Sequence, residues 1–568
     1  MSLKKDKSLI LVSGTLAVLM IGLAVVGGFK SYSPVPFWDA WTGYLEFYMK
    51  VADGDIGAWW AQHNEHRIML ARPLFWADIK WFGGMSWFLV AGNYFLVGAS
   101  AYIFWRLIRE SNSAEQPGAD QVALGLFTTA WLFLWVQHEN LTWGFQGIFI
   151  LAQLLPLCAL YWLHKSVVGI DAGRHFVVAC AFGLASVGTM ANGILALPLM
   201  TFYALLTRQG LIRVCVLTTL SVVTLFYYFH GYHAPAHHGL LSRALSDLSG
   251  LLQYVLLFIG SPFYFLFGNG VFGKLIALLA GLILVGGSAR LAIKALRQPR
   301  EATLKLALLF FILYVGAAAI AAGGGRLSVF GIDQALSSRY TTPALMAWAA
   351  LLVLYSPAIL SAIRARNKKY LFPFAVLAFL MIFLQLRASE SQEGMLFERK
   401  IAALALELQV KDRILVERIH WNLQEALILA EKASARNLSI FGVYPYLGAR
   451  EQLGLSVQQP TLPACQGYLE AAEAIEGEAR FVRVRGWIFN SAARTYPHVI
   501  RLLNSQSKVV GYALAGQPRP DVAVAIDKKA LQAGYRGYLL ADQMGAVLTL
   551  QGESPACQMQ TSVPSLPF

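Results

Sequence analysis

An acidic residue between two tryptophans is the first feature that could carry chemistry. Asp39 lies in the stretch SPVPFWDAW, flanked by Trp38 and Trp41, soon after an N-terminal apolar run. A carboxylate in aromatic surroundings can have a raised pKa and act as a general base. The alternative is that Asp39 caps a helix covering 40–51. Spacing alone leaves both roles open.

A polar cluster follows in the stretch AQHNEHRIML, residues 61–70. His63, Glu65, His66 and Arg67 offer a base, a set of metal ligands or a clamp for a phosphate group. The H-x-E-H spacing matches no standard zinc motif. A divalent metal therefore stays open as a cofactor, and no other cofactor is indicated. The alternative is a hydrogen-bonded loop that packs on lipid headgroups.

A third polar stretch, HENLTWGFQ, joins two apolar runs. It places Glu139, Asn140 and Gln146 at the mouth of the two helices that those runs predict. Polar side chains at this depth are costly unless they line a cavity. A polar turn between helices is the alternative.

Two arginines occur in a late loop, GGGRLSVFGIDQALSSRYTTP. Arg326 follows three glycines, and Arg339 precedes Tyr340 at the start of an apolar run. The guanidinium group donates hydrogen bonds in a fork that suits phosphate. Snorkelling of the arginines to lipid headgroups is the alternative.

A histidine-rich loop, HGYHAPAHHG, is a weaker candidate for metal binding. Its histidines have a spacing that suits a helix, but Gly231 and Pro235 oppose one. The chain contains no Walker A motif, no G-x-S-x-G motif and no CxxC pair. Nucleotide binding through a phosphate loop is therefore not expected.

These candidate residues lie between long apolar runs that predict a polytopic membrane protein. The chain is 57% hydrophobic and 14% charged, against about 25% charged residues in soluble proteins. The net charge of +14 comes from short basic loops between the runs, which marks a cytoplasmic membrane face instead of a nucleic-acid surface. We expect about eleven spanning helices, at roughly 8–28, 86–108, 121–138, 146–164, 174–190, 192–207, 213–230, 271–292, 303–322, 342–363 and 370–387.

The basic loops also predict the orientation of the chain. We interpret 250–268 as a re-entrant or interfacial segment, because Gly260, Pro262 and Gly268 interrupt a helix there. We expect an uncleaved first helix instead of a signal peptide. With eleven crossings, the N-terminus lies in the cytoplasm and the C-terminus outside. The expected location is a bacterial inner membrane, with the C-terminal domain in the periplasm.

The C-terminal third follows a different pattern. Residues 388–440 predict amphipathic helices after a transmembrane domain that covers 1–387, and 441–568 predict a β-sandwich with short alternating runs. Cys465 and Cys557 bracket this domain. In an extracytoplasmic domain these two cysteines are expected to form a disulfide.

A first helix, a long external loop with an early aspartate, many further helices, a late loop with Arg339 and Tyr340 and an external domain form an arrangement that resembles the GT-C superfamily of integral membrane glycosyltransferases. The stretches FWDAW, HNEHRI, ENLTWGFQ and SSRYTTP lie within this arrangement. The resemblance covers about 1–387 and implies a polyprenyl-phosphate-linked sugar as donor. It also implies Asp39 as general base and Arg339, with Arg326 or Arg67, as ligands of the leaving phosphate. Many members carry paired acidic residues in the first loop, whereas Ala40 follows Asp39 here.

The resemblance implies an extracytoplasmic glycan, lipid or protein as acceptor. Three other functions stay open. They are a flippase or transporter of lipid-linked glycans, an O-antigen-type glycan ligase, and a non-enzymatic assembly or sensor protein. Apolar spans with charges gathered at their ends disfavour transport.

Overall fold

The computed structural model describes residues 2–112, 118–234, 246–365, 368–458 and 461–564. Contacts divide the chain into two compact units. Unit 1 comprises Met1–Lys30, Ile56–Leu74 and Trp87–Glu390, and unit 2 comprises Ser31–Asp55, Phe75–Ser86 and Ser391–Phe568. The expected first loop, 30–85, is thus divided between the units. The expected helical segment 388–440 and the C-terminal β-domain belong almost entirely to one unit.

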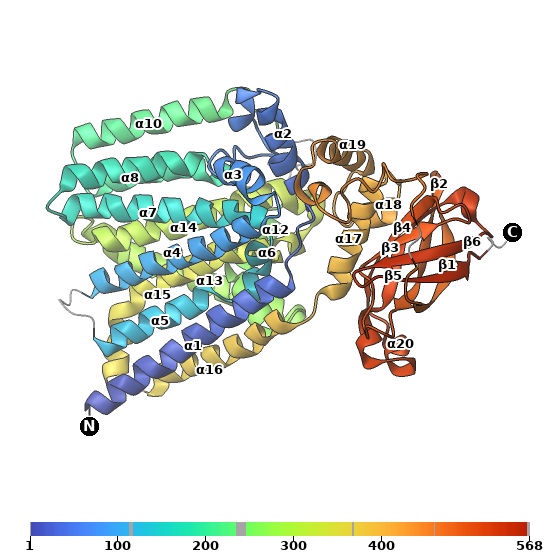
Figure 1. Cartoon of the computed structure of the whole chain (residues 1–568). Helices are drawn as coiled ribbons and strands as arrows, with labels where there is room; N and C mark the ends of the chain where they lie inside the picture. The colour runs from blue at the N-terminus through green and yellow to red at the C-terminus, as the bar shows by residue number, and fades with distance from the viewer. Residues whose placement is uncertain (1, 113–117, 235–245, 366–367, 459–460, 565–568) are drawn as a thin grey trace. The chain divides into compact units, whose positions relative to one another are not determined.

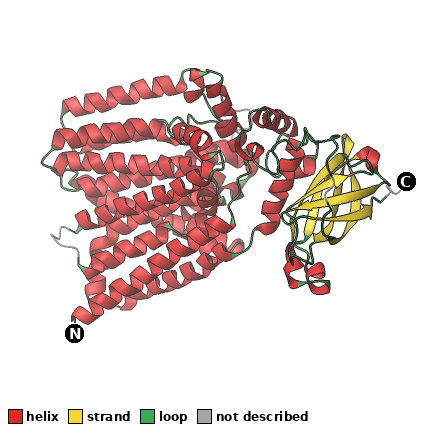
Figure 2. Cartoon of the chain, in the orientation of Figure 1, coloured by secondary structure: helices red, strands yellow, loops and turns green. Residues whose placement is uncertain are grey.

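Unit 1 is a bundle of long apolar helices (Figures 1 and 2). Ten helical spans in the described ranges are long and apolar enough to cross a membrane. They are built on α1 (Ser2–Lys30), α4 (Trp87–Ser111), α5 (Ala119–Leu132), α7 (Gly147–Val168), α10 (Leu211–Phe229), α12 (Leu248–Phe267), α13 (Val271–Arg297), α14 (Thr303–Phe330), α15 (Thr341–Arg364) and α16 (Lys368–Leu386). Two shorter apolar helices, α8 (Ala172–Val187) and α9 (Ala196–Leu206), complete the bundle.

The two ends of the bundle are distinguished by arginines and lysines in the last turns of α4, α7, α13 and α15. At one end, called the basic end, Lys165 lies 3.0 Å from Glu110 and Arg364 lies 2.7 Å from Asp120. His164 and Thr303 meet there at 3.0 Å. At the opposite end, called the cavity end, the 61–70 stretch meets the last turns of α14 and the start of α15.

Helix α12 is continuous where an interruption was predicted. Gly260 and Pro262 lie inside it, and only Gly268, with φ +102°, ends it. A Cβ atom on Gly260 would lie 1.9 Å from the Ala277 carbonyl oxygen. This glycine therefore lets α12 and α13 pack closely, instead of breaking the helix.

The helices before and after α12 in the sequence, α10 and α13, respectively end and begin at the cavity end. The preceding helix α10 ends at Phe229, and the carbonyl of the next residue, His230, accepts from Arg67 at 2.7 Å. After α12, Lys274 in the first turn of α13 pairs with Asp333 at 2.6 Å, just beyond α14. Helix α13 then runs to the basic end, where α14 starts at Thr303.

Unit 2 combines short helices with one sheet. The helical elements are η1 (Trp41–Glu46), α2 (Phe47–Ala52), part of α3 (Arg72–Phe82), α17 (Glu393–Glu407), α18 (Arg413–Val416), α19 (Leu423–Ser434) and α20 (Pro520–Ala525). Asp412, at the start of α18, is fully buried. It accepts two hydrogen bonds from Arg483, at 2.8 and 2.9 Å, and one from Tyr538 at 2.9 Å. The helices are thus joined to the sheet by a buried charge.

The C-terminal strands form one antiparallel sheet instead of the two packed sheets of a sandwich (Figure 2). Its order is β1-β2-β5-β4-β3-β6-β7. The strands are β1 (Gln466–Ile475), β2 (Glu478–Phe489), β3 (Val499–Leu503), β4 (Val509–Gln517), β5 (Gly534–Leu540), β6 (Val547–Glu553) and β7 (Cys557–Ser562).

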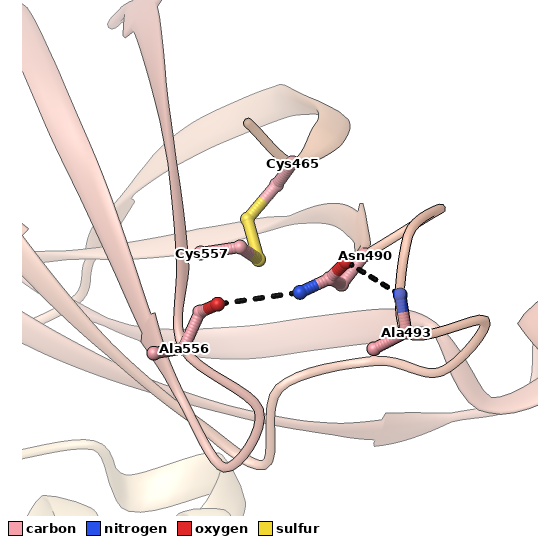
Figure 3. The surroundings of a disulfide bond; sticks show 5 residues. All are labelled: Cys465, Asn490, Ala493, Ala556 and Cys557. Carbon is pink, nitrogen blue, oxygen red and sulfur yellow. Dashed lines mark hydrogen bonds between the residues drawn. A yellow bond between two sulfur atoms is a disulfide. The ribbon is translucent and has the colours of Figure 1, made fainter. Parts of the chain in front are cut away.

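The disulfide between Cys465 and Cys557 joins the two edges of this sheet (Figure 3). Cys465 directly precedes β1 and Cys557 begins β7, and their Cα atoms lie 5.4 Å apart. Beside the disulfide, the Asn490 side chain donates to the Ala556 carbonyl at 3.2 Å and accepts from the Ala493 amide at 3.0 Å. The disulfide expected from the sequence is therefore present, and it links the two edge strands of the sheet covalently.

Glu407 makes the stability of unit 2 dependent on pH. Burial raises its pKa from 4.5 to about 7, and the Ser434 hydroxyl opposes this rise while the Glu451 carboxylate adds to it. Because the folded-state pKa is raised, the stabilisation is complete below 4.5 and is lost as the pH rises through about 7. Allowing for solvent screening, we expect a loss of about 2 kcal/mol.

We therefore expect Glu407→Gln to raise the thermal transition of the full-length protein in detergent at pH 8 and to leave it nearly unchanged at pH 5. Glu417→Gln is the matched control, because Glu417 is an exposed glutamate paired with Arg413. A Glu407→Gln protein with the same pH dependence as the wild type would show that burial of this carboxyl does not govern the effect.

Candidate functional site

A cavity of about 260 Å³ lies at the cavity end of unit 1. Its wall combines polar and apolar groups from the 61–70 stretch, α7, α12, α14 and the segments that precede α9 and α15. The polar lining residues are Glu65, His66, Gln153, Asn192, Tyr232, Arg326 and Tyr340. The apolar ones include Phe149, Met190, Phe258 and three alanines of α14.

An ion pair forms one side of the cavity. Arg326 Nη2 lies 2.6 Å from Glu65 Oε1, and Arg326 Nη1 donates to the Tyr340 hydroxyl. The two charged side chains are only 19% and 16% exposed. Arg326 is therefore neutralised by a carboxylate from the first loop, and the predicted residues Glu65, Arg326 and Tyr340 are brought together.

His66 supports the same carboxylate. Its Nδ1 accepts from the Ala191 amide at 3.0 Å, so the ring proton lies on Nε2, 3.4 Å from Glu65 Oε1. This hydrogen bond specifies the neutral tautomer, because a protonated ring has no acceptor. The backbones of His63 and His66 exchange hydrogen bonds of 2.8 and 2.9 Å. That tight turn holds Glu65 between them.

Arg339 has a different environment. Asn140 fixes its backbone by donating to the Arg339 carbonyl at 2.9 Å. Its guanidinium carbon lies 5.8 Å from the centre of the Tyr340 ring, within reach of a cation–π interaction. Its Nε is buried and has no hydrogen-bond partner among the described residues. Arg339 is thus half-buried beside a cavity-lining tyrosine and retains donor capacity.

The other residues of the third polar stretch support the segment that carries Arg339. Asn140 also donates to Thr342 Oγ1 at 2.7 Å, and the Glu139 amide donates to Ser338 Oγ at 3.3 Å. Gln146 is buried, and its Oε1 has no partner within the described ranges. Their hydrogen bonds make Glu139 and Asn140 a scaffold, and neither they nor Gln146 line the cavity.

Arg67 is engaged with the backbone. Its Nε, Nη1 and Nη2 donate to the carbonyls of Tyr228, Trp60 and His230 at 2.8, 2.9 and 2.7 Å. The side chain is buried, and its guanidinium carbon lies 5.3 Å from the Trp60 ring centre. This geometry favours a structural role that ties the first loop to the end of α10.

Asp39 belongs to unit 2 and has its own surroundings there. Trp38 has a left-handed backbone with φ +46°, and its amide donates to the Ile419 carbonyl at 2.8 Å. A π-helix, η1, starts two residues after Asp39. Next to Ile419, His420 is buried; burial lowers its pKa, while the Asp39 and Glu425 carboxylates oppose the change. Asp39 and His420 are therefore neighbours, which the sequence does not indicate.

Metal binding gains no support from these side chains. No group of three or more His, Cys, Asp or Glu residues that could hold a metal ion occurs in the described part of the chain. In the histidine-rich loop, the His233 backbone pairs with the Gln62 side chain. His237 and His238 lie outside the described residues.

Sequence reasoning missed Gln153. It lies in α7 within the apolar run ILAQLLPL, it is 2% exposed, and it lines the cavity. Its Oε1 has no hydrogen-bond partner among described residues. A polar residue in the middle of a spanning helix is by itself a signal for a functional site, and that signal was available.

No protein-family model matches the chain, and no curated protein or solved structure shows significant similarity to it.

Proposed function

We propose that this chain is a membrane glycosyltransferase that moves a sugar from a polyprenyl-phosphate donor to an extracytoplasmic glycan, lipid or protein. The observation that carries the proposal is Arg339. It is a half-buried guanidinium whose Nε has no partner among the described residues, and it lies beside Tyr340, which lines a cavity at one end of the helical bundle. The phosphate of a polyprenyl lipid lies at the membrane surface, where one end of the bundle is expected to lie. The arginine guanidinium suits phosphate because it donates a forked pair of hydrogen bonds.

The transfer step needs a base and a stabilised leaving group. The acceptor hydroxyl gives its proton to the Asp39 carboxylate, and its oxygen forms a bond to the anomeric carbon of the sugar. The bond between that carbon and the phosphate oxygen breaks, and the polyprenyl phosphate leaves with the electron pair. Arg339 stabilises the charge that develops on the phosphate.

The hydrogen bonds at the two bundle ends support eleven crossings. Helices α8 and α9 each connect the ends, because Leu70 bonds the Gly188 carbonyl at the cavity end and Tyr203 bonds the Thr303 carbonyl at the basic end. Helix α12 is not counted, because α10 ends and α13 begins at the cavity end. The basic end then faces the cytoplasm, and the cavity and unit 2 face the periplasm.

Cysteine labelling tests this orientation. We expect Ser505→Cys, in the exposed β3–β4 turn, to react with a membrane-impermeant maleimide in spheroplasts. Arg300→Cys, in the exposed α13–α14 connection, should react only after the membrane is permeabilised. Labelling of both positions from the same side would contradict the eleven-crossing topology and the proposed function.

Arg339→Lys tests the phosphate site. The substitution keeps the charge but loses the fork, so binding of undecaprenyl phosphate should weaken about tenfold, as measured by native mass spectrometry of the detergent-purified protein. Arg106→Lys is the matched control, since Arg106 is an arginine of α4 toward the basic end that bonds Tyr102. Equal lipid binding by Arg339→Ala and the wild type would remove Arg339 from the site.

Asp39→Asn tests the base. The amide keeps the shape of the side chain but cannot take the proton, so sugar transfer in proteoliposomes should fall by roughly 10²–10⁴-fold. Binding of undecaprenyl phosphate should remain. Asp53→Asn, at the end of α2 and paired with Arg436, is the control.

A helix-capping role for Asp39 predicts the opposite result, because asparagine caps helices about as well as aspartate. Full transfer activity in Asp39→Asn would make Asp39 structural and would move the search for the base to Glu65.

A further inference from the structure

We infer that the cavity binds one neutral sugar residue of the donor, while the phosphate stays outside it at Arg339. This inference rests on the proposed function and names the substrate class of its site. It assigns different roles to Arg326, in the last turns of α14, and to Arg339, just before α15. Arg326 forms part of a sugar-binding wall, and Arg339 receives the phosphate.

The charge of the cavity favours a neutral ligand. Its lining contains one carboxylate, Glu65, and one guanidinium, Arg326, which lie 2.6 Å apart, and His66 is the neutral tautomer. The lining charge therefore sums to zero. A phosphate at Arg326 would have to displace Glu65 and leave that carboxylate largely buried without its partner, which is strongly unfavourable.

Gln153 points to a ligand that donates hydrogen bonds. Its Oε1 is a buried acceptor on the cavity wall, with no partner in the described part of the chain. A buried acceptor left unsatisfied costs roughly 1–3 kcal/mol, and a ligand hydroxyl would satisfy it. A phosphate bearing two negative charges has no proton to offer, whereas a sugar presents several hydroxyl groups.

The aromatic part of the cavity lining suits the apolar face of a sugar ring. The Tyr340 ring centre lies 4.9 Å from that of Phe258 and 6.1 Å from that of Phe149. Small residues of α14, among them Ala322 and Gly325, leave room beside these rings. Aromatic and aliphatic carbons there can pack against C–H groups while polar residues bind the hydroxyls.

The size of the cavity favours a single sugar. Its volume of about 260 Å³ lies below the range of roughly 300–1,000 Å³ that is typical of pockets for drug-sized ligands. A lipid-linked oligosaccharide, the substrate expected of a glycan ligase, would extend well beyond it. The donor is therefore a polyprenyl-phosphate monosaccharide.

A binding comparison with two probe types tests this assignment. The probes are undecaprenyl phosphate and a panel of its glycosyl phosphodiesters, each carrying one neutral sugar (glucose, mannose, galactose or arabinose), added to the full-length protein in detergent. We expect the wild type to bind at least one glycosyl ester about tenfold more tightly than undecaprenyl phosphate. Gln153→Met should remove most of that preference and leave binding of undecaprenyl phosphate unchanged.

Gln121→Met provides the matched control. Gln121 is also a buried glutamine of a membrane helix with an unpartnered amide atom, but it does not line the cavity. Both substitutions remove a buried polar atom without a partner, so neither should lower the thermal stability of the ligand-free protein. Loss of sugar preference in Gln153→Met without loss of stability separates ligand binding from a structural role.

Ala322→Leu supplies an independent test by filling the cavity. It should weaken binding of the glycosyl ester and spare undecaprenyl phosphate. The inference is overturned if no ester binds more tightly than undecaprenyl phosphate, or if the preference survives both Gln153→Met and Ala322→Leu. If undecaprenyl phosphate binds in a manner that depends on Arg339, such a result rejects the sugar site alone. Absence of any Arg339-dependent lipid binding instead rejects the proposed function.

Discussion

The ion pair between Glu65 and Arg326 is the interaction on which the cavity end of unit 1 depends. It joins residues 261 positions apart in the sequence, at a distance of 2.6 Å and with little exposure. Removing either partner would leave a largely buried charge without compensation. Because Glu65 neutralises Arg326, the cavity carries no net charge, and Arg339 is left as the arginine with donor capacity. One contact thus removes the net charge of the cavity and leaves Arg339 as the arginine on which the proposed phosphate site rests.

Close backbone packing is the constraint that sequence patterns indicate least well. Hydropathy predicts the long helices of unit 1, because a spanning segment must be apolar over its length. The same approach predicted a break at Gly260 and Pro262, where α12 continues. Gly260 lies against the Ala277 carbonyl and Gly281 against Leu256. These glycines lie in the interface between α12 and α13, where they allow close packing. The sequence alone does not distinguish such a glycine from one that interrupts a helix, because it does not show the partner helix.

In unit 2 the alternating runs predict β2 to β6, but β1 carries the sequence QGYLEAAEAI, whose alanines and glutamates favour a helix. Pairing with β2 overrides this preference. At the site, the polar stretches identify Glu65, Arg326, Arg339 and Tyr340, because their side chains are expensive near a bilayer. Their partners could not be predicted. The engagement of Arg67 with three carbonyls and the pairing of Arg326 with Glu65 depend on segments that only the fold brings together.

The backbone around Asp39 is more specialised than a helix start requires. A cap needs a short polar side chain in an extended conformation, and any ordinary α-helix can follow it. Here the preceding tryptophan has φ +46°, an uncommon and strained conformation for a bulky residue, and a π-helix follows. The hydrogen bond from Trp38 to Ile419 holds this turn beside the buried His420. His420 Nδ1 lies 3.0 Å from the Asn422 amide nitrogen and 2.9 Å from the Asn422 carbonyl oxygen, so the backbone of Asn422 fixes the orientation of the ring. Strained backbone and π-helical turns concentrate at functional sites, where they aim a side chain that regular structure would direct elsewhere. This geometry supports the proposal that the Asp39 carboxylate is positioned for a function, because a residue that only caps a helix needs neither feature.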